Sequence, residues 1–359
     1  MRVRPFSTGD AGDTGLPCEK HLAFSSGKVN EWRPSVACAL GRSPSALALS
    51  LFLATHAFAQ DTWPTRPVRM IVSSSPAGGT DVYARLVANV YSEAFRQSFI
   101  VENRPGGNGT IAADAVAKST PDGHTLLVSA SPSIVIAPVL FKKQPYDIDR
   151  DLAPVTRGVL SPLALCVLPA QPTKTLAELI ALARRDDAKV PYGSAGAASM
   201  THLGVRLFEE AAGVRFLHIP YKGIGPATQD LLGGQITFVL TDLPASIHHI
   251  RARKLLPLAV MPKTALLPST PSFAEAGFPG VEVFAAFAVV APGGTPAPIM
   301  QRLSAALMKA MKSPPLAGKL DELGLIPVFD TPEEAAVRLR KEREMWASFV
   351  KRTGMTVEQ

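Results

Sequence analysis

The stretch that decides the fold of this chain is Val68-Arg69-Met70-Ile71-Val72-Ser73-Ser74-Ser75-Pro76-Ala77-Gly78-Gly79-Thr80-Asp81. Its apolar start, 68–72, predicts a strand, and the serine- and glycine-rich segment 73–79 predicts a loop. Apolar side chains then recur at helical spacing, so a helix should follow, with Thr80 and Asp81 as candidate caps. The stretch therefore predicts one strand, one glycine loop and one helix in succession.

The same unit recurs along the chain. Further strands are predicted at 99–102, 125–128, 163–168, 216–219, 236–240, 256–260 and 284–290. Further helices are predicted at 110–118, 175–185, from about 200 to Gly213, 298–312 and 332–352. Alternation of short apolar runs with amphipathic stretches is typical of an α/β fold, and we expect its sheets to be mainly parallel.

The N-terminal residues 1–59 resemble an export leader. An apolar-leaning run, 46–58, ends in the small-x-small triplet Ala57-Phe58-Ala59, which predicts a signal peptide cleaved before Gln60. The run is shorter than the roughly 20 apolar residues that a membrane span needs. We therefore exclude 1–59 from the fold and expect a periplasmic mature chain.

The predicted mature chain, 60–359, is long enough for two domains. Its one cysteine, Cys166, rules out an intramolecular disulfide after processing. The leader holds 6 of the 37 Lys and Arg and 4 of the 30 Asp and Glu, which leaves 31 basic and 26 acidic residues, a net charge of +5. Because the basic residues are dispersed rather than clustered, we expect no nucleic acid partner.

Two loops, 73–81 and 194–202, are candidate anion sites because each joins a predicted strand to a predicted helix. The start of a helix presents unpaired backbone N–H groups and the positive end of its dipole. Gly78 and Gly79 would let a ligand approach the backbone closely. Tight turns without a ligand remain the alternative interpretation of both loops.

Catalytic, dinucleotide and metal sites are less well supported. Ser194, His202 and Asp242 could form a triad, but Tyr192 stands where a nucleophile elbow needs glycine. Segment 107–112 has the spacing of a dinucleotide fingerprint but lacks the acidic residue after the next strand. The histidines lack metal-ligand spacing. We expect no catalytic residues, no cofactor and no metal.

Eight ordered motifs across 61–359 resemble those of the Bug family, the TctC-like solute receptors of tripartite tricarboxylate transporters. They are Asp61-Thr62-Trp63-Pro64-Thr65-Arg66-Pro67, Pro76-Ala77-Gly78-Gly79-Thr80-Asp81, Val101-Glu102-Asn103-Arg104-Pro105-Gly106, Pro121-Asp122-Gly123-His124-Thr125-Leu126, Ser194-Ala195-Gly196 with Thr201-His202-Leu203, His218-Ile219-Pro220-Tyr221-Lys222-Gly223, Asp230-Leu231-Leu232-Gly233-Gly234-Gln235 and Ala291-Pro292-Gly293-Gly294-Thr295-Pro296.

The resemblance implies a two-lobed, type II-like α/β periplasmic binding protein with its ligand cleft between the lobes. Lobe one would comprise 60–165 and 287–359, and lobe two 166–286, with crossings near 163–168 and 285–290. The implied ligand is a small carboxylate held by the two loops. The implied ligand-binding residues are Ser74, Ser75, Pro76, Ala77, Gly78, Gly79, Thr80, Asp81, Ser131, Ser194, Gly196, Ala197, Ser199, Thr201, His202, Tyr221, Thr241 and Asp242.

Four places depart from the family pattern. Ser74-Ser75 stands where many members have an aromatic residue and proline, and Ala77 stands where they have glycine. Ala197-Ala198 replaces a frequent Asn-Gly, and Thr241-Asp242 replaces a frequent Asp-Asn. These departures favour a changed ligand specificity over a lost site, because both helix starts persist.

Two functions of different classes stay open at this point: a monomeric transport receptor, which the resemblance favours, and a secreted serine hydrolase. Stoichiometric binding without turnover would separate them. The receptor's partner would be the membrane subunits of a tripartite permease; a sensor protein in their place is an alternative that the sequence does not separate.

Overall fold

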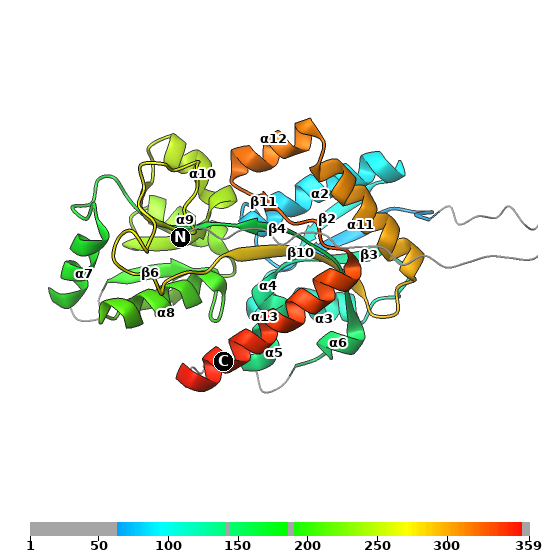
Figure 1. Cartoon of the computed structure of the whole chain (residues 1–359), viewed down its shortest axis with the longest axis horizontal. Coiled ribbons are helices and arrows are strands. Elements are labelled where there is room, and N and C mark those ends of the chain that lie inside the picture. Colours follow the sequence, from blue (N-terminus) through cyan, green and yellow to red (C-terminus); the bar gives the residue numbers. More distant parts are fainter. Residues whose placement is uncertain (1–62, 141–143, 186–189, 354–359) are drawn as a thin grey trace, which may run out of the picture. The chain divides into compact units, whose positions relative to one another are not determined.

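The computed structural model describes residues 63–140, 144–185 and 190–353 (Figure 1). The predicted leader, 1–59, lies outside the described residues. Contacts within the chain separate 1–60 from 61–359, and everything below concerns the second unit. None of the helices described combines the length and apolar character that crossing a bilayer requires.

The first sheet has six strands in the order β11-β4-β10-β3-β1-β2. They are β1 (Val68–Val72), β2 (Phe99–Asn103), β3 (Thr125–Ala130), β4 (Leu152–Ser161), β10 (Ala285–Pro292) and β11 (Ile326–Pro327). Strand β1 pairs parallel with β2 and β3, whereas β10 pairs antiparallel with β3 and β4, and β11 pairs antiparallel with β4.

The second sheet has five strands in the order β7-β6-β8-β5-β9. They are β5 (Leu163–Val167), β6 (Pro191–Ser194), β7 (Leu217–Pro220), β8 (Phe238–Asp242) and β9 (Leu256–Met261). Strand β6 pairs parallel with β7 and β8, and β5 pairs antiparallel with β8 and β9.

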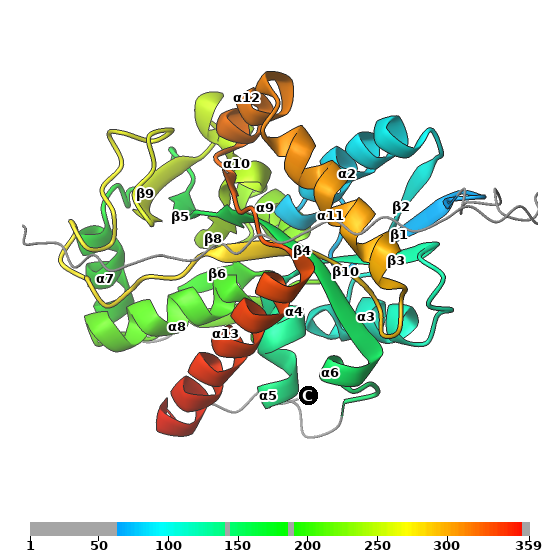
Figure 2. The same ribbon diagram turned by 45° about the vertical axis from the view of Figure 1, so that its right-hand side comes forward.

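The expectation of mainly parallel sheets is therefore wrong, since both sheets are mixed. The reason lies where the chain passes between them. Strand β4 continues through Pro162 directly into β5, and the chain returns from β9 into β10, which runs antiparallel to β4 (Figure 2). Each passage inserts a strand that runs against the strands supplied by the strand–loop–helix units.

The helices of the unit cover both sheets. They are α2 (Gly79–Phe95), the short 3-10 helix η1 (Gly107–Gly109), α3 (Thr110–Ala117), α4 (Ser131–Val135), α5 (Ala137–Leu140), α6 (Ile148–Asp151), α7 (Leu176–Arg185), α8 (Met200–Ala212), α9 (Ile224–Leu232), α10 (Leu243–Arg251), α11 (Ala297–Met311), α12 (Pro314–Leu323) and α13 (Pro332–Thr353). Helices α2 and α3 pack on the first sheet, and α8, α9 and α10 on the second.

Helices α9, α10 and α12 and strand β4 are elements that the sequence pattern did not predict, and β4 is the longest strand among the described residues. Pro154, Arg157 and Gly158 interrupt its apolar residues, so neither an alternating nor a continuous apolar run is visible. The strand forms because it lies between β10 and β11, and Val155 and Val159 are fully buried there. Strand β5, which follows β4 in the chain after Pro162, is buried at all five residues.

Candidate functional site

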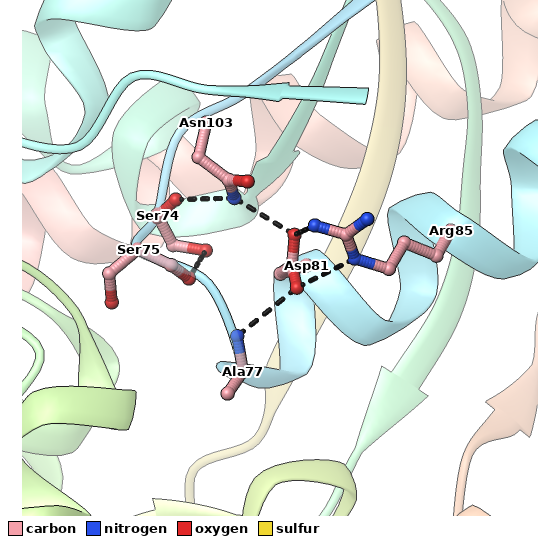
Figure 3. Close-up of polar contacts among 6 residues, drawn as sticks. All are labelled: Ser74, Ser75, Ala77, Asp81, Arg85 and Asn103. Atoms are coloured by element: carbon pink, nitrogen blue, oxygen red, sulfur yellow. Dashed lines mark hydrogen bonds and ion pairs between the residues drawn. The ribbon is translucent and has the colours of Figure 1, made fainter. Parts of the chain in front are cut away.

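The loop between β1 and α2, residues 73–78, is held in shape by the buried carboxylate of Asp81 (Figure 3). Its Oδ2 accepts a hydrogen bond from the Ala77 N–H at 3.1 Å, and its Oδ1 accepts one from Asn103 Nδ2 at 2.9 Å. Arg85 donates to both oxygens at 3.0 Å. Asn103 also donates to the Ser74 carbonyl at 3.0 Å. Asp81 thus fixes the loop from behind.

Capping of α2 differs from the sequence prediction. The N-cap is Gly78, and no side chain bonds to the helix start, so neither Thr80 nor Asp81 is the cap. Asp81 bonds instead to the amide of Ala77, one residue before the cap. The start of α2 therefore has no capping side chain of its own, and its first amides can face an acidic group from elsewhere.

The loop between β6 and α8, residues 195–199, repeats this design with different side chains. Ser199 is the N-cap, and its Oγ accepts from the His202 N–H at 3.3 Å and donates to the Gly196 carbonyl at 2.7 Å. Thr201 Oγ1 accepts from the Ala195 N–H at 2.9 Å. This loop is therefore fixed by the first turn of its own helix.

The two loops share one unusual backbone conformation. Ala77 and Ala198 each precede the N-cap, and each has φ of 63°, in the left-handed region. The amide of each donates at 3.1 Å to the side chain four residues later, Asp81 in one loop and His202 Nδ1 in the other. Two loops far apart in the sequence thus present their helix starts in the same way.

Ser194, His202 and Asp242, which the sequence analysis considers and disfavours as a triad, do not form one. The Oγ of Ser194 lies 2.7 Å from Nε2 of His218, and Nδ1 of His202 is occupied by the Ala198 amide. The two imidazole rings stack with centroids 4.1 Å apart. Ser194 is fully buried and is not among the residues that line the cleft cavity.

Both imidazoles are neutral at neutral pH. Burial, and to a lesser extent the nearby His218 and Arg206, lower the pKa of His202 to about 3. Burial likewise lowers the pKa of His218 to about 4, with a smaller effect of Arg206. His202 can therefore act as an acceptor for the Ala198 amide, which is a structural task rather than a catalytic one.

Asp242 lies where helix α2, which packs on the first sheet, contacts helix α10, which packs on the second sheet. It is the N-cap of α10, and its Oδ1 accepts from the Ala245 N–H at 3.2 Å. Gly79 of α2 is so close that a Cβ there would overlap the Asp242 carboxylate. Burial raises the pKa of Asp242 to about 6, against the opposing effect of hydrogen bonds from the backbone amides of Ala245, Asp242 itself and Gly79.

The start of α9 also lies against the first loop. A Cβ on Gly225 would meet the Pro76 carbonyl oxygen at 2.6 Å, closer than real Cβ contacts come. Glycine at 225 is therefore required for this approach. Together with the contact between Gly79 and Asp242, it brings the first loop against helices that pack on the second sheet.

A cavity of about 460 Å³ opens between these elements. Ten residues predicted for the site line it: Ser74, Gly78, Gly79, Thr80, Gly196, Ala197, Ser199, Thr201, Tyr221 and Asp242. The size falls in the ordinary range for small-molecule sites, roughly 300–1,000 Å³. The lining includes one cationic side chain, the exposed Lys222.

Eight predicted residues lie behind or beside the lining. They are Ser75, Pro76, Ala77, Asp81, Ser131, Ser194, His202 and Thr241. Asp81, Ser194 and His202 make the loop contacts described above. Ser131 Oγ donates to Glu342 Oε1 of α13 at 2.9 Å, and Thr241 is fully buried, its Oγ1 3.2 Å from the Asp242 carbonyl.

The sequence interpretation missed the lining residues that follow β2. Gly106, Gly107, Asn108, Gly109 and Thr110 line the cavity as a third strand–loop–helix connection. The signal was present, because segment 107–112 stands between a predicted strand, 99–102, and a predicted helix, 110–118, as the two candidate anion loops do. The segment was compared with a dinucleotide fingerprint and was not included in the predicted site. Within the described part of the chain, no His, Cys, Asp or Glu cluster is placed to hold a metal ion.

Comparison with known proteins agrees with this geometry. Residues 83–355 match the family model described as the tripartite tricarboxylate transporter family receptor. Protein BugT of Bordetella pertussis is 35% identical over 313 residues, which cover 85% of this chain and 96% of BugT.

Two solved structures are similar over nearly their whole length. Rpa4515 of R. palustris, solved with adipate, is 35% identical with a TM-score of 0.78 and covers 82% of this chain and 99% of its own. The periplasmic binding protein BugD is 29% identical with a TM-score of 0.77 and covers 82% and 100%. Both the predicted fold, a two-lobed α/β periplasmic binding protein, and the predicted family are confirmed. The chain belongs to the receptors of the tripartite tricarboxylate transporter family.

Proposed function

We propose that this receptor binds the carboxylate of a small organic acid in the cavity and delivers the acid to the membrane subunits of a tripartite permease. The observation that carries the proposal is the matched pair of loops before α2 and α8, each with its helix start lining the same cavity. The adipate in the similar structure of Rpa4515 supports the ligand class.

Backbone groups supply most of the proposed binding energy. A hydrogen bond to a charged group contributes about 1.5–3 kcal/mol, and a helix dipole about 0.3–1 kcal/mol. A few such bonds reach the roughly 8 kcal/mol of a micromolar complex. We propose that Gly78, Gly79, Thr80, Ser199 and Thr201 contact the ligand, whereas Asp81 and His202 act through the loops that they hold.

The remaining features of the proposal follow from the family and the leader. The family is one of substrate-binding receptors, and we propose that this chain has no enzymatic activity. We also propose a periplasmic monomer whose two lobes have the boundaries 60–165 with 287–359 and 166–286. The passages of the chain at Pro162 and between β9 and β10 lie within a few residues of these boundaries.

A carboxylate panel tests the proposal directly. Thermal shift and calorimetry with acetate, succinate, adipate and citrate should find at least one acid that binds with one-to-one stoichiometry. At a hundredfold excess over Kd, the bound acid raises the free energy of unfolding by about 2.7 kcal/mol. Stabilisation by a neutral sugar with none by any acid would show that the ligand class is wrong.

Two variants separate the receptor from a hydrolase. Gly79→Val should abolish binding because its side chain would overlap Asp242 and cover the start of α2. Gly280→Val is the matched control, since a Cβ at Gly280 meets no atom within 4 Å. Ser194→Ala should cost about 0.5–1.5 kcal/mol of affinity at most. Ester turnover that disappears in Ser194→Ala would overturn the receptor assignment.

A further inference from the structure

Asp242 is a carboxylate that the protein itself places in the cavity where the ligand's carboxylate is proposed to bind. Its side chain caps α10 at 3.2 Å from the Ala245 amide, and Gly79 at the start of α2 is in contact with it. The residue is only 7% exposed and lines the cavity. The start of α2 therefore already faces one acidic group before any ligand enters.

We propose that Asp242 takes up one proton when an organic acid binds, so that the receptor captures the acid and a proton together. This inference rests on the proposed function. The proton comes from solvent and forms an O–H bond on the Asp242 carboxyl group, and no other bond changes. The protonated oxygen can then donate a hydrogen bond to the incoming carboxylate.

The geometry leaves little distance between the two acidic groups. Amides in the first turn of a helix lie within one pitch, about 5.4 Å. A carboxylate bound to the Thr80 amide therefore lies about one turn or less from Asp242, which is in contact with Gly79. Two carboxylates at that separation inside a protein favour sharing a proton, as like charges raise one another's pKa.

The surroundings of Asp242 offer it no countercharge. On α2 the nearest charged groups, Asp81 and Arg85, are paired with each other. Strands β5 and β10 contribute the apolar Leu163 and Phe287 at this point. Lys222, before α9, lines the cavity but is exposed.

The other ionisable groups of α10 lie in its last turn, as His248, His249 and Arg251, and α12, which packs against α10, carries Asp321 and the exposed ion pair of Lys319 with Glu322. Burial is the largest influence on the pKa of Asp242 and raises it to about 6, and no charged side chain of the described residues is among the causes. A further negative charge nearby moves that pKa higher still.

The test measures affinity and proton uptake for succinate and adipate between pH 6.5 and 8.5. The wild-type affinity should fall about tenfold per pH unit in this range, because the free protein must take up a proton that is increasingly scarce. Calorimetry in HEPES and in Tris, which differ in ionisation enthalpy, should give close to one proton taken up per acid bound near pH 8.

Asp242→Asn is the decisive variant, since asparagine caps a helix as well as aspartate and carries no charge. It should bind the acids with an affinity independent of pH and with no proton uptake. Asp321→Asn removes an exposed carboxylate of α12 and should behave as the wild type.

Acid binding by the wild type without proton uptake, or a pH slope that persists in Asp242→Asn, would overturn this inference while leaving the proposed function intact. Failure of every panel acid to bind at any pH would overturn both.

Discussion

Ala77 and Ala198 hold a backbone conformation that alanine disfavours. Each has φ of 63°, and a left-handed conformation costs a residue with a Cβ about 1–2 kcal/mol. The loops adopt it nonetheless, because the amide of each alanine is bound by Asp81 or by His202. The strain is thus tied to the shape that exposes the helix starts.

Replacing Ala77 by glycine should stabilise the protein. Glycine adopts positive φ without the Cβ penalty, so Ala77→Gly should raise the free energy of unfolding by about 1 kcal/mol. Urea denaturation measures the change. The control is Ala305→Gly on the exposed side of α11, where glycine should cost about 1 kcal/mol. Equal destabilisation by both variants would show that Ala77 is unstrained.

At the scale of elements, the start of α9 packs closely against the first loop, between β1 and α2. Gly225→Ala should place a Cβ against the Pro76 carbonyl, a backbone atom that cannot move aside as a side chain can. We expect acid affinity to fall about tenfold, equivalent to about 1.4 kcal/mol. Calorimetry measures the affinity, and small-angle scattering should show a larger radius of gyration than in the wild type.

Gly318→Ala in α12 is the control for this variant, because its Cβ meets no atom within 4 Å. It should retain the affinity and dimensions of the wild type. An unchanged affinity in Gly225→Ala would mean that the approach of α9 to the first loop does not contribute to binding.

The units of strand, loop and helix could be predicted from the sequence because each carries its own period and its own loop residues. The run 68–81 gave strand, loop and helix close to their observed bounds. Strand β4 could not be predicted, because its burial depends on β10, more than 120 residues later in the chain. The local sequence pattern of one strand carries no information about its pairing with a strand so distant in the chain.

The parts of the candidate site that consist of backbone groups at helix starts could be predicted from the sequence. Helix starts after glycine loops are visible in a sequence, whereas side-chain partners depend on packing. The pairing of Ser194 with His218 rather than His202 follows from the parallel register of β6 and β7, which sets Ser194 beside Pro220 and Tyr192 beside His218. The contact of Asp242 with Gly79 joins elements of different sheets and leaves no trace in either segment.

At the scale of the whole molecule, the mature protein should begin near Gln60. The apolar run and the triplet before Gln60 carry the features that signal peptidase reads. Protein recovered from the periplasm of the native host should therefore give an N-terminal sequence that starts at or within a few residues of Gln60. Intact 1–359 in the cytoplasm of that host would contradict the export prediction.

Cys166 lies in the middle of β5, between β8 and β9, with no exposed surface. Burial raises the pKa of its thiol, so the reactive thiolate is scarce in the folded state. In the predicted mature chain, 60–359, this is the one thiol, and it belongs to the strand that follows the passage from the first sheet. The rate at which a thiol reagent labels Cys166 therefore reports how often β5 becomes exposed, and a ligand that stabilises the folded state should slow that labelling.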